Sequence, residues 1–164
     1  MAAETHPDIR RTLLLLVKDD QILLAMKKRG FGAGKWNGVG GKIEQGESVE
    51  DALVRECQEE IGVTPTSWDK VAELDFVQDA TNEPWHMYVH AYISHEWEGE
   101  PAESEEMRPE WYKIAEIPYK DMWDDDIFWL ERALTGEKLY GKFTFDENDK
   151  MLSHTITAIE SFSE

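Results

Sequence analysis

The chain has 164 residues, of which 41% are hydrophobic and 11% aromatic, enough for a packed core and too many for a disordered chain. Asp and Glu total 35 against 17 Lys and Arg, so the formal net charge is −18 at pH 7. Such a charge repels nucleic acid polymers and anionic membranes, and a small anionic substrate needs divalent cations between itself and the carboxylates. The single cysteine, Cys57, excludes an internal disulfide and a zinc site built from several thiolates.

The first part of the chain predicts two buried strands joined by a tight turn. An apolar run from Arg11 to Lys18 is followed by Asp19-Asp20 and a second run over 21–26. Residues 30–42 then contain six glycines, which permit backbone conformations and close approaches that side chains forbid. We therefore expect a hairpin followed by an irregular loop.

A helix is predicted over residues 48–61. Ser48 is typical of an N-cap, Asp51 is its capping-box partner, and Gly62 is typical of a C-terminal stop. Apolar residues recur at helical spacing and predict a buried stripe formed by Val49, Ala52, Leu53, Cys57 and Ile61. We interpret Cys57 as a packing residue rather than a reactive thiol.

The rest of the chain predicts further strands and a second helix. Runs rich in Val, Phe, Tyr and Trp predict strands over 70–78, 86–95 and 108–114. A helix over 125–135 ends at Gly136, and two last strands, 138–145 and 151–160, are joined by the turn 146–149. No repeat, linker or apolar signal segment interrupts this pattern, which predicts one α/β domain over 1–164, located in the cytoplasm.

The predicted helix 48–61 carries an unusual group of carboxylates. With Leu53 at the centre of the buried stripe, Glu60 lies at roughly −20°, Glu56 at roughly −60° and Glu59 at roughly −120°. An inward glutamate is costly unless it is paired or bound to a metal, so a positive charge should lie among the three. The alternative is a solvated acidic helix end with a simple ion pair to Arg55 or Lys70.

The spacing of the residues around Glu56, Glu59 and Glu60 favours a metal site over a solvated acidic helix end. Gly41, Glu47, Arg55, Glu56, Glu59, Glu60 and Gly62 form the pattern G-x5-E-x7-R-E-x-x-E-E-x-G, which closes with the apolar Val63. This segment, 41–63, resembles the signature of the Nudix (MutT-like) hydrolases. The resemblance implies an α/β/α sandwich with a mixed sheet and a loop-helix-loop that binds Mg²⁺ or Mn²⁺ and splits a diphosphate linkage in a nucleoside diphosphate derivative.

The same resemblance implies roles for single residues. Metal ligands are expected at Gly40, through its carbonyl, and at Glu56, Glu59 and Glu60. Glu47 and Arg55 are expected to form the ion pair that holds the loop to the helix. Glu106, on a facing loop, is a further candidate metal ligand or general base, and its alternative is a solvated acid among acidic neighbours.

A second group of residues suits the recognition of a purine base. The indole of Trp123 offers a stacking face, and the adjacent carboxyls of Asp125 and Asp126 cannot both ionise easily, so one can keep its proton and act as a donor. Asn37 adds another donor and acceptor. The alternative is that the two aspartates only cap the helix that begins there.

Outside the signature, segments 27–38, 106–109 and 120–123 resemble those of the oxidised purine nucleoside triphosphatases within the family. That resemblance implies base contacts from Asp125 and Asp126, ring contacts from Trp123 and Phe31, and positions around the nucleoside for Thr12 and Lys27. The expected substrates are 8-oxo-dGTP and 2-hydroxy-dATP, hydrolysed by a monomer to the monophosphate and pyrophosphate, which implies sanitation of the nucleotide pool.

The chain also departs from that subgroup. Asp124 stands where Pro is expected, Gln78 stands where Phe is expected, and the segment 79–86 is longer and more polar. We expect Gln78 to alter the rim of the pocket. The remaining alternatives are hydrolysis of ADP-ribose or a dinucleoside polyphosphate, and a non-catalytic nucleotide-binding module, which the three intact glutamates disfavour.

Overall fold

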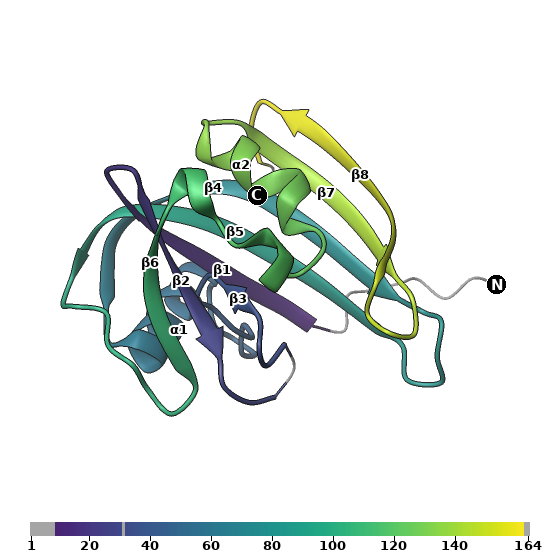
Figure 1. Ribbon diagram of the computed structural model, residues 1–164, viewed down its shortest axis with the longest axis horizontal. Coiled ribbons are helices and arrows are strands. Elements are labelled where there is room, and N and C mark those ends of the chain that lie inside the picture. Colours follow the sequence, from purple (N-terminus) through teal and green to yellow (C-terminus); the bar gives the residue numbers. More distant parts are fainter. Residues whose placement is uncertain (1–8, 31, 163–164) are drawn as a thin grey trace.

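The computed structural model describes residues 9–30 and 32–162, which form an eight-stranded mixed sheet with a helix against each face (Figure 1). The strand order is β3-β2-β1-β5-β4-β7-β8, and β6 pairs with β2. Two strand pairs are parallel, β1 with β5 and β4 with β7, and the other pairs are antiparallel. The strands are β1 Ile9–Lys18, β2 Gln21–Lys27, β3 Trp36–Asn37, β4 Thr64–Gln78, β5 Trp85–Glu98, β6 Met107–Lys113, β7 Lys138–Phe145 and β8 Met151–Ile159.

Alternation along β1 divides the core between the two faces of the sheet. Leu13 and Leu15 pack with the helix α2 (Asp126–Leu134), whereas Leu14 and Leu16 pack with the helix α1 (Val49–Ile61). Because successive strand side chains point to opposite faces, one apolar run serves two cores. The predicted α/β/α sandwich with a mixed sheet is therefore confirmed. Two short 3₁₀ turns, Ile114–Glu116 and Tyr119–Asp121, lead from β6 towards α2.

The ends of α1 are those that its sequence predicts. The hydroxyl of Ser48 accepts a hydrogen bond of 3.0 Å from the backbone N–H of Asp51, and Gly62 ends the helix with φ 72°. The predicted stripe is buried except at Val49, which is half-buried. Burial raises the pKa of the Cys57 thiol to about 12, which agrees with its interpretation as a packing residue.

Two parts of the sheet differ from the sequence prediction. The glycine-rich loop contains the short strand β3, in which Trp36 pairs with Met26 of β2. The strand β4 begins at Thr64 rather than near residue 70. Its first half contains Pro65 and three register shifts against β5, so the alternation from which a strand is predicted is interrupted there.

The loop before α1 lies directly against β1, and Gly40 makes this possible. Thr12 donates its N–H to the carbonyl of Gly41 at 2.9 Å, and Leu14 donates to that of Val39 at 2.6 Å. Gly40 has φ 155°, and a Cβ there would lie 1.9 Å from the carbonyl oxygen of Thr12. Only glycine allows the loop to approach the strand this closely.

The Gly40→Ala substitution is therefore expected to lower the free energy of unfolding. Gly46→Ala is the matched control, because Gly46 also has a positive φ, 81°, but a Cβ there meets nothing within 4 Å. We expect Gly40→Ala to be less stable than Gly46→Ala by about 2 kcal/mol in urea unfolding, the usual scale for overpacking. Equal stabilities of the two variants would show that the close contact with Thr12 is not a constraint.

Candidate active site

Glu60 is a buried carboxyl at the C-terminal end of α1. The residue is 5% exposed, and its Oε1 accepts a hydrogen bond of 2.8 Å from the backbone N–H of Gly40. Burial raises the pKa of Glu60 to about 7, and repulsion from Glu56 and Glu106 adds to the effect. The side chain thus points inward, as its helical position indicates, and its charged form is disfavoured unless a cation is present.

Exposure increases around the helix from Glu60 to Glu56 to Glu59. Glu56 is half-buried, and burial raises its pKa as well. Its carboxyl group packs on Gly41, where a Cβ would lie 2.5 Å from the carboxyl carbon. The side chain of Glu59 is 60% exposed. The order follows the angles expected for an ideal helix, so the three carboxylates form one edge that faces the loop.

Arg55 holds this edge to the loop. Its Nε and Nη2 donate to the two oxygens of Glu47 at 2.7 and 3.0 Å, and Nη2 also donates to the carbonyl of Lys42 at 3.0 Å. Its Nη1 donates to Glu56 at 2.8 Å and to Glu59 at 3.3 Å. The hydrogen bonds from Arg55 lower the pKa of Glu47 to about 2. A bidentate pair of this kind fixes the direction of both side chains.

The glutamates suit a hard divalent cation by their chemistry. Their donors are all oxygen, two of the carboxyls have raised pKa values through burial, and the absence of a side chain at Gly41 lets the Glu56 carboxyl lie directly against the loop. In residues 9–30 and 32–162, no three acidic, histidine or cysteine side chains already converge in a metal-binding geometry. Arg55 instead contacts Glu56 and Glu59. The donor set therefore fits Mg²⁺ or Mn²⁺ in composition and charge.

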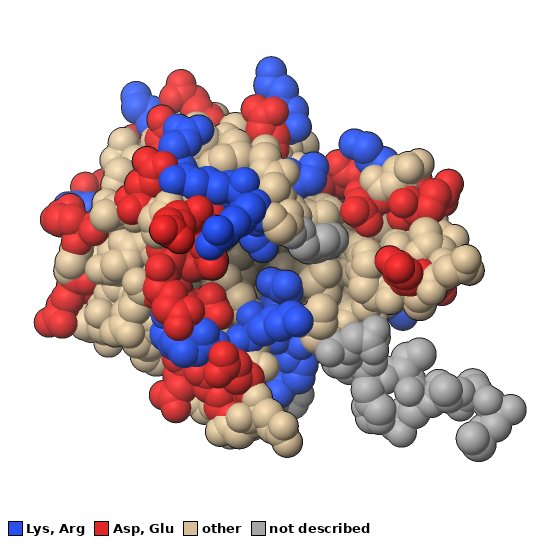
Figure 2. Space-filling model, turned by 90° about the horizontal axis from the view of Figure 1, so that it is seen from below, with Lys and Arg blue, Asp and Glu red and all other residues tan. Residues whose placement is uncertain are grey.

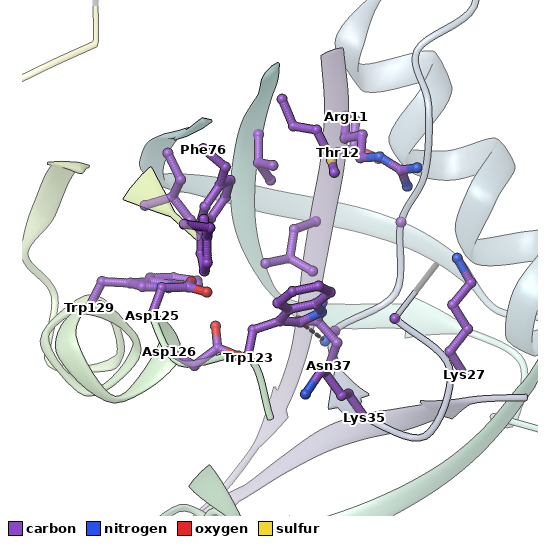
Figure 3. Close-up of a pocket in the computed structure, with 18 of the residues that line it drawn as sticks. Arg11, Thr12, Lys27, Lys35, Asn37, Phe76, Trp123, Asp125, Asp126 and Trp129 are labelled. Atoms are coloured by element: carbon purple, nitrogen blue, oxygen red, sulfur yellow. Dashed lines mark hydrogen bonds between the residues drawn. The ribbon is translucent and has the colours of Figure 1, made fainter. Parts of the chain in front are cut away.

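Glu60 also lines a pocket that extends along the sheet to α2 (Figure 3). Phe76, Trp85, Met87 and Phe145 provide an apolar wall, and Phe145 lies 5.6 Å from the Trp85 ring and 6.2 Å from the Trp123 ring. Of the residues expected from the sequence to bind substrate or metal, the pocket is lined by Thr12, Lys27, Asn37, Gly40, Glu60, Trp123, Asp125 and Asp126. Residues distant in the sequence therefore meet in one cavity.

Asp125 and Asp126 are both buried at the α2 end of this pocket, each 3% exposed. Asp125 Oδ2 accepts a hydrogen bond of 2.9 Å from the indole N–H of Trp129, whereas Asp126 Oδ2 has no partner within the described part of the chain. Burial raises the pKa of Asp125 to about 6 and that of Asp126 further, since Asp125 repels its negative charge. Asp125 occupies the N-cap position but its side chain makes no capping hydrogen bond. Capping therefore does not account for this side chain.

Among the other predicted residues, Thr12 and Asn37 line the same cavity, whereas Glu106 does not. The hydroxyl of Thr12 is buried without a partner among the described residues, and the side-chain oxygen of Asn37 accepts from the N–H of Gly38 at 2.9 Å. Glu106 is exposed, lies 3.8 Å from Arg29, and does not line the pocket, although its charge acts on Glu60. Phe31 lies outside the described residues.

The pocket carries positive charge in a protein of net charge −18. On the face shown in Figure 2, lysine and arginine side chains border a central hollow. The pocket lining includes Arg11, Lys27 and Lys35, and the Lys35 ammonium lies 5.2 Å from the centre of the Trp123 ring. Cations beside buried carboxyls are the arrangement expected for an anionic ligand that is held partly through metal ions.

Residues 7–132 match the NUDIX domain. The chain belongs to the Nudix hydrolase family. Nudix hydrolases generally use divalent metal ions, and they act on phosphoanhydride bonds. Among curated relatives, the mouse protein named oxidized purine nucleoside triphosphate hydrolase is 42% identical over 151 residues, which cover 92% of this chain and 96% of the relative. The zebrafish (Danio rerio) protein of the same name is 44% identical over 149 residues, covering 91% and 94%.

The fold agrees with this assignment. The crystal structure of a MutT protein from Bacillus halodurans matches with a TM-score of 0.79 and 29% identity, covering 90% of this chain and 97% of that one. None of the helices in residues 9–30 and 32–162 is both long and apolar enough to cross a membrane.

The Nudix signature of this chain lies on α1 and the loop that precedes it.

The Nudix site also contains residues that the sequence did not single out. Arg11 and Lys35 line the pocket as cations, and Phe76, Trp85 and Phe145 line it as aromatic residues. Alternation along β1 places Arg11 and Leu13 on the same face of the sheet. This is the feature of the sequence from which the position of Arg11 in the pocket could have been predicted. The aromatic residues come from three strands, β4, β5 and β7, and meet only in the folded sheet.

Gln78 does not itself line the main pocket, and its effect on the pocket rim stays a prediction. Its side chain is buried and holds the turn between β4 and β5, accepting from the N–H of Ala80 at 2.7 Å and donating to Thr81 at 3.2 Å. Gln78 lines a smaller neighbouring hollow rather than the main pocket, and Trp85 borders both cavities. Asp124 accepts a hydrogen bond of 3.1 Å from the N–H of Met151 and so connects the start of α2 to β8.

The raised pKa of Glu60 predicts a pH dependence of stability. In metal-free protein, Glu60 binds a proton more tightly when folded, with a pKa of about 7 against 4.5 for the free side chain. The free energy of unfolding should therefore fall as pH rises from about 5 to about 8. Glu60→Gln should show a shallower fall, because the amide does not titrate.

The measurement is urea unfolding in the presence of a chelator, with Glu59→Gln as the exposed control. Asp125 and Asp126 contribute a fall of the same sign to every variant, so the difference between curves reports Glu60 alone. Parallel curves for wild type and Glu60→Gln would contradict the assignment of a raised pKa to Glu60.

Proposed function

We propose that this protein hydrolyses oxidised purine nucleoside triphosphates, with 8-oxo-dGTP and 2-hydroxy-dATP as substrates, to the monophosphate and pyrophosphate. The observation that carries the proposal is a single pocket that contains a buried aspartate pair at one end and, at the other, Glu60 of the Nudix helix. The names of the mouse and zebrafish relatives, which align along more than nine-tenths of their lengths, support it.

The aspartate end supplies what an oxidised purine edge requires. Asp126 with its proton donates a hydrogen bond, and the unprotonated Asp125 accepts one, so the pair offers both partners at adjacent positions. Oxidation at C8 of guanine converts an acceptor nitrogen into an N–H and adds a carbonyl, which changes the donor and acceptor pattern of the base. A buried site matched to one pattern rejects the other, because it leaves polar groups without partners.

The aromatic residues hold the ring of the base. Trp123 offers an indole face, and the wall formed by Phe76, Trp85 and Phe145 limits the space beside it. Asn37, whose oxygen is engaged by Gly38, has its amide group available for a further contact at the base edge. Thr12, with a buried and unpartnered hydroxyl, offers another polar contact within the cavity.

The glutamate end provides the chemistry. The residues that would hold Mg²⁺ or Mn²⁺ are Glu56, Glu59 and Glu60, with the Gly40 carbonyl and Glu106 as further oxygen donors. When bound, the metal ion neutralises the polyphosphate and stabilises the charge that develops as water attacks phosphorus. One glutamate of the cluster, or Glu106, accepts the proton of the attacking water. Arg55, through its hydrogen bonds to Glu47, holds the loop in a fixed position against the helix.

We infer a setting in keeping with this chemistry. The partner is a small nucleotide, the acting unit is a monomer with residues 1–164 as one domain, and the compartment is the cytoplasm. The net charge of −18 opposes a nucleic acid polymer, and the buried Cys57 suits a reducing environment. The role that follows is sanitation of the nucleotide pool, which avoids DNA damage.

The first test concerns the base. Asp126→Ala removes the donor, so the preference for 8-oxo-dGTP over dGTP, expressed as a ratio of kcat/KM values, should fall by about tenfold or more. Asp121→Ala, at an exposed carboxylate upstream of α2, is the control and should keep the ratio. ADP-ribose and a dinucleoside polyphosphate complete the panel. A wild type that prefers either of these contradicts the proposal and leaves the family assignment intact.

The second test concerns the metal. Removal of divalent cations by a chelator should abolish hydrolysis, and Glu60→Gln should lower kcat/KM by about a hundredfold or more. Binding of Mn²⁺, followed by electron paramagnetic resonance, should weaken in the same variant while its circular dichroism spectrum is retained. At subsaturating metal concentration, activity should rise with pH through about 7, because the metal ion competes with the proton on Glu60. Full turnover by Glu60→Gln would exclude it as a metal ligand.

A further inference from the structure

Arg11 is a cation in the pocket that has no role in the chemistry described above. It lies on β1 beside Thr12, and its Nε is buried with no hydrogen-bond partner in residues 9–30 and 32–162. Its neighbour Arg10 points to the other face of the sheet and donates to Nε2 of His90 at 3.2 Å. Two adjacent arginines on one strand therefore differ: the Arg10 guanidinium has a side-chain partner, whereas the Nε of Arg11 has none in the part of the chain that the structure describes.

The surroundings of Arg11 are acidic. Burial lowers the pKa of Arg11, and the negative charges of Glu56 and Glu60 oppose this effect. A guanidinium that is partly desolvated and lacks a hydrogen-bonded partner is costly, and a bidentate oxyanion satisfies its donors best. Glu56 and Glu60 are close enough to act on the charge of Arg11, but neither accepts a hydrogen bond from its buried Nε–H. This N–H is therefore a donor that a ligand in the pocket can use.

The position of Arg11 identifies the oxyanion. In Figure 3, the charged ends of Arg11 and Lys27 lie on the side of the cavity away from Asp125 and Asp126. The aspartate pair would repel phosphate, whereas Arg11 and Lys27 attract it. The pocket therefore has an end for the base and a cationic end next to the glutamate helix.

We propose that Arg11 is a specificity-determining residue that binds the polyphosphate of the substrate through its guanidinium, so that the enzyme favours triphosphates over nucleotides with fewer phosphates. The inference rests on the proposed function, because it requires a nucleotide polyphosphate in this pocket. The competing account is that Arg11 serves only as a counter-charge for Glu56 and Glu60. In that case only its charge matters, so Arg11→Lys should bind inorganic tripolyphosphate in metal-free protein as tightly as wild type does.

The experiment measures binding of inorganic tripolyphosphate, which has no base, to metal-free full-length protein by calorimetry. Arg11→Met should bind it about tenfold more weakly than wild type, the effect of losing a charge-assisted hydrogen bond. Arg10→Met is the matched control, since it removes the same charge from the neighbouring residue, and should stay within about twofold of wild type. Arg11→Lys should bind with intermediate affinity, because it keeps the positive charge and loses the planar guanidinium that donates two parallel hydrogen bonds.

A second pair of ligands connects the result to the nucleotide. Arg11→Met should lose affinity for 8-oxo-dGTP and retain most of its affinity for 8-oxo-dGMP, with unchanged circular dichroism and thermal unfolding. Wild-type affinity of Arg11→Met for tripolyphosphate, or equal losses in Arg10→Met, would overturn the inference. Failure of wild type to hydrolyse 8-oxo-dGTP, combined with an Arg11-dependent loss of tripolyphosphate binding, would refute the proposed function and leave the role of Arg11 standing.

Discussion

The cost of burying a carboxyl group in a protein dominated by acidic residues sets the conditions for the rest of this structure. Glu60 and Asp126 are almost completely buried at opposite ends of one pocket, and neither is neutralised by an ion pair with a lysine or arginine in the described residues. Each needs either a proton or a cation. At the α2 end a second aspartate repels the charge and favours the proton, whereas at the α1 end a set of oxygen donors favours a metal ion. The same physical problem therefore has two chemically distinct solutions within one cavity.

The central strand β1 connects these two ends. Its alternating side chains supply both cores, its backbone pairs with the glycine-rich loop, and Arg11 and Thr12 reach into the cavity between them. The loop in turn presents the Gly40 N–H to Glu60. A strand buried on both faces is among the most rigid parts of a sheet, so the positions that it fixes vary little. The position of Glu60 is thus fixed, through the loop, by the packing of β1 in the core.

Features with a local cause were predictable from the sequence. The ends of α1 depend on Ser48 and Gly62 alone, and the inward direction of Glu60 follows from helical spacing within one element. The difficulty of ionising both Asp125 and Asp126 was anticipated from their adjacency, but their burial depends on α2 packing against the sheet. The apolar wall was not predictable in this way, because Phe76, Trp85 and Phe145 belong to three strands whose order a single sequence does not specify.

Two features of β4 were not predictable from the sequence, for definite physical reasons. Bulges and Pro65 interrupt the alternation in the first half of β4, so no periodic pattern marks the strand there. Gln78 has the same parity as Phe76, which lines the pocket, but it is the last residue of the strand and is held by the following turn. Parity is informative within a strand and loses its meaning where the strand ends.

Trp85 lines two neighbouring cavities, and this position has a consequence for how the main pocket can change shape during evolution. This residue begins β5 immediately after an exposed turn and borders both the main pocket and the smaller hollow beside it. Insertions and deletions accumulate most easily in such turns. Changes in the length of the 79–84 segment can therefore move one wall of the base cavity while the glutamate helix, the glycine-rich loop and β1 stay in place. Under the proposed function, the length of this surface turn can alter base selection while the residues of the signature segment stay the same.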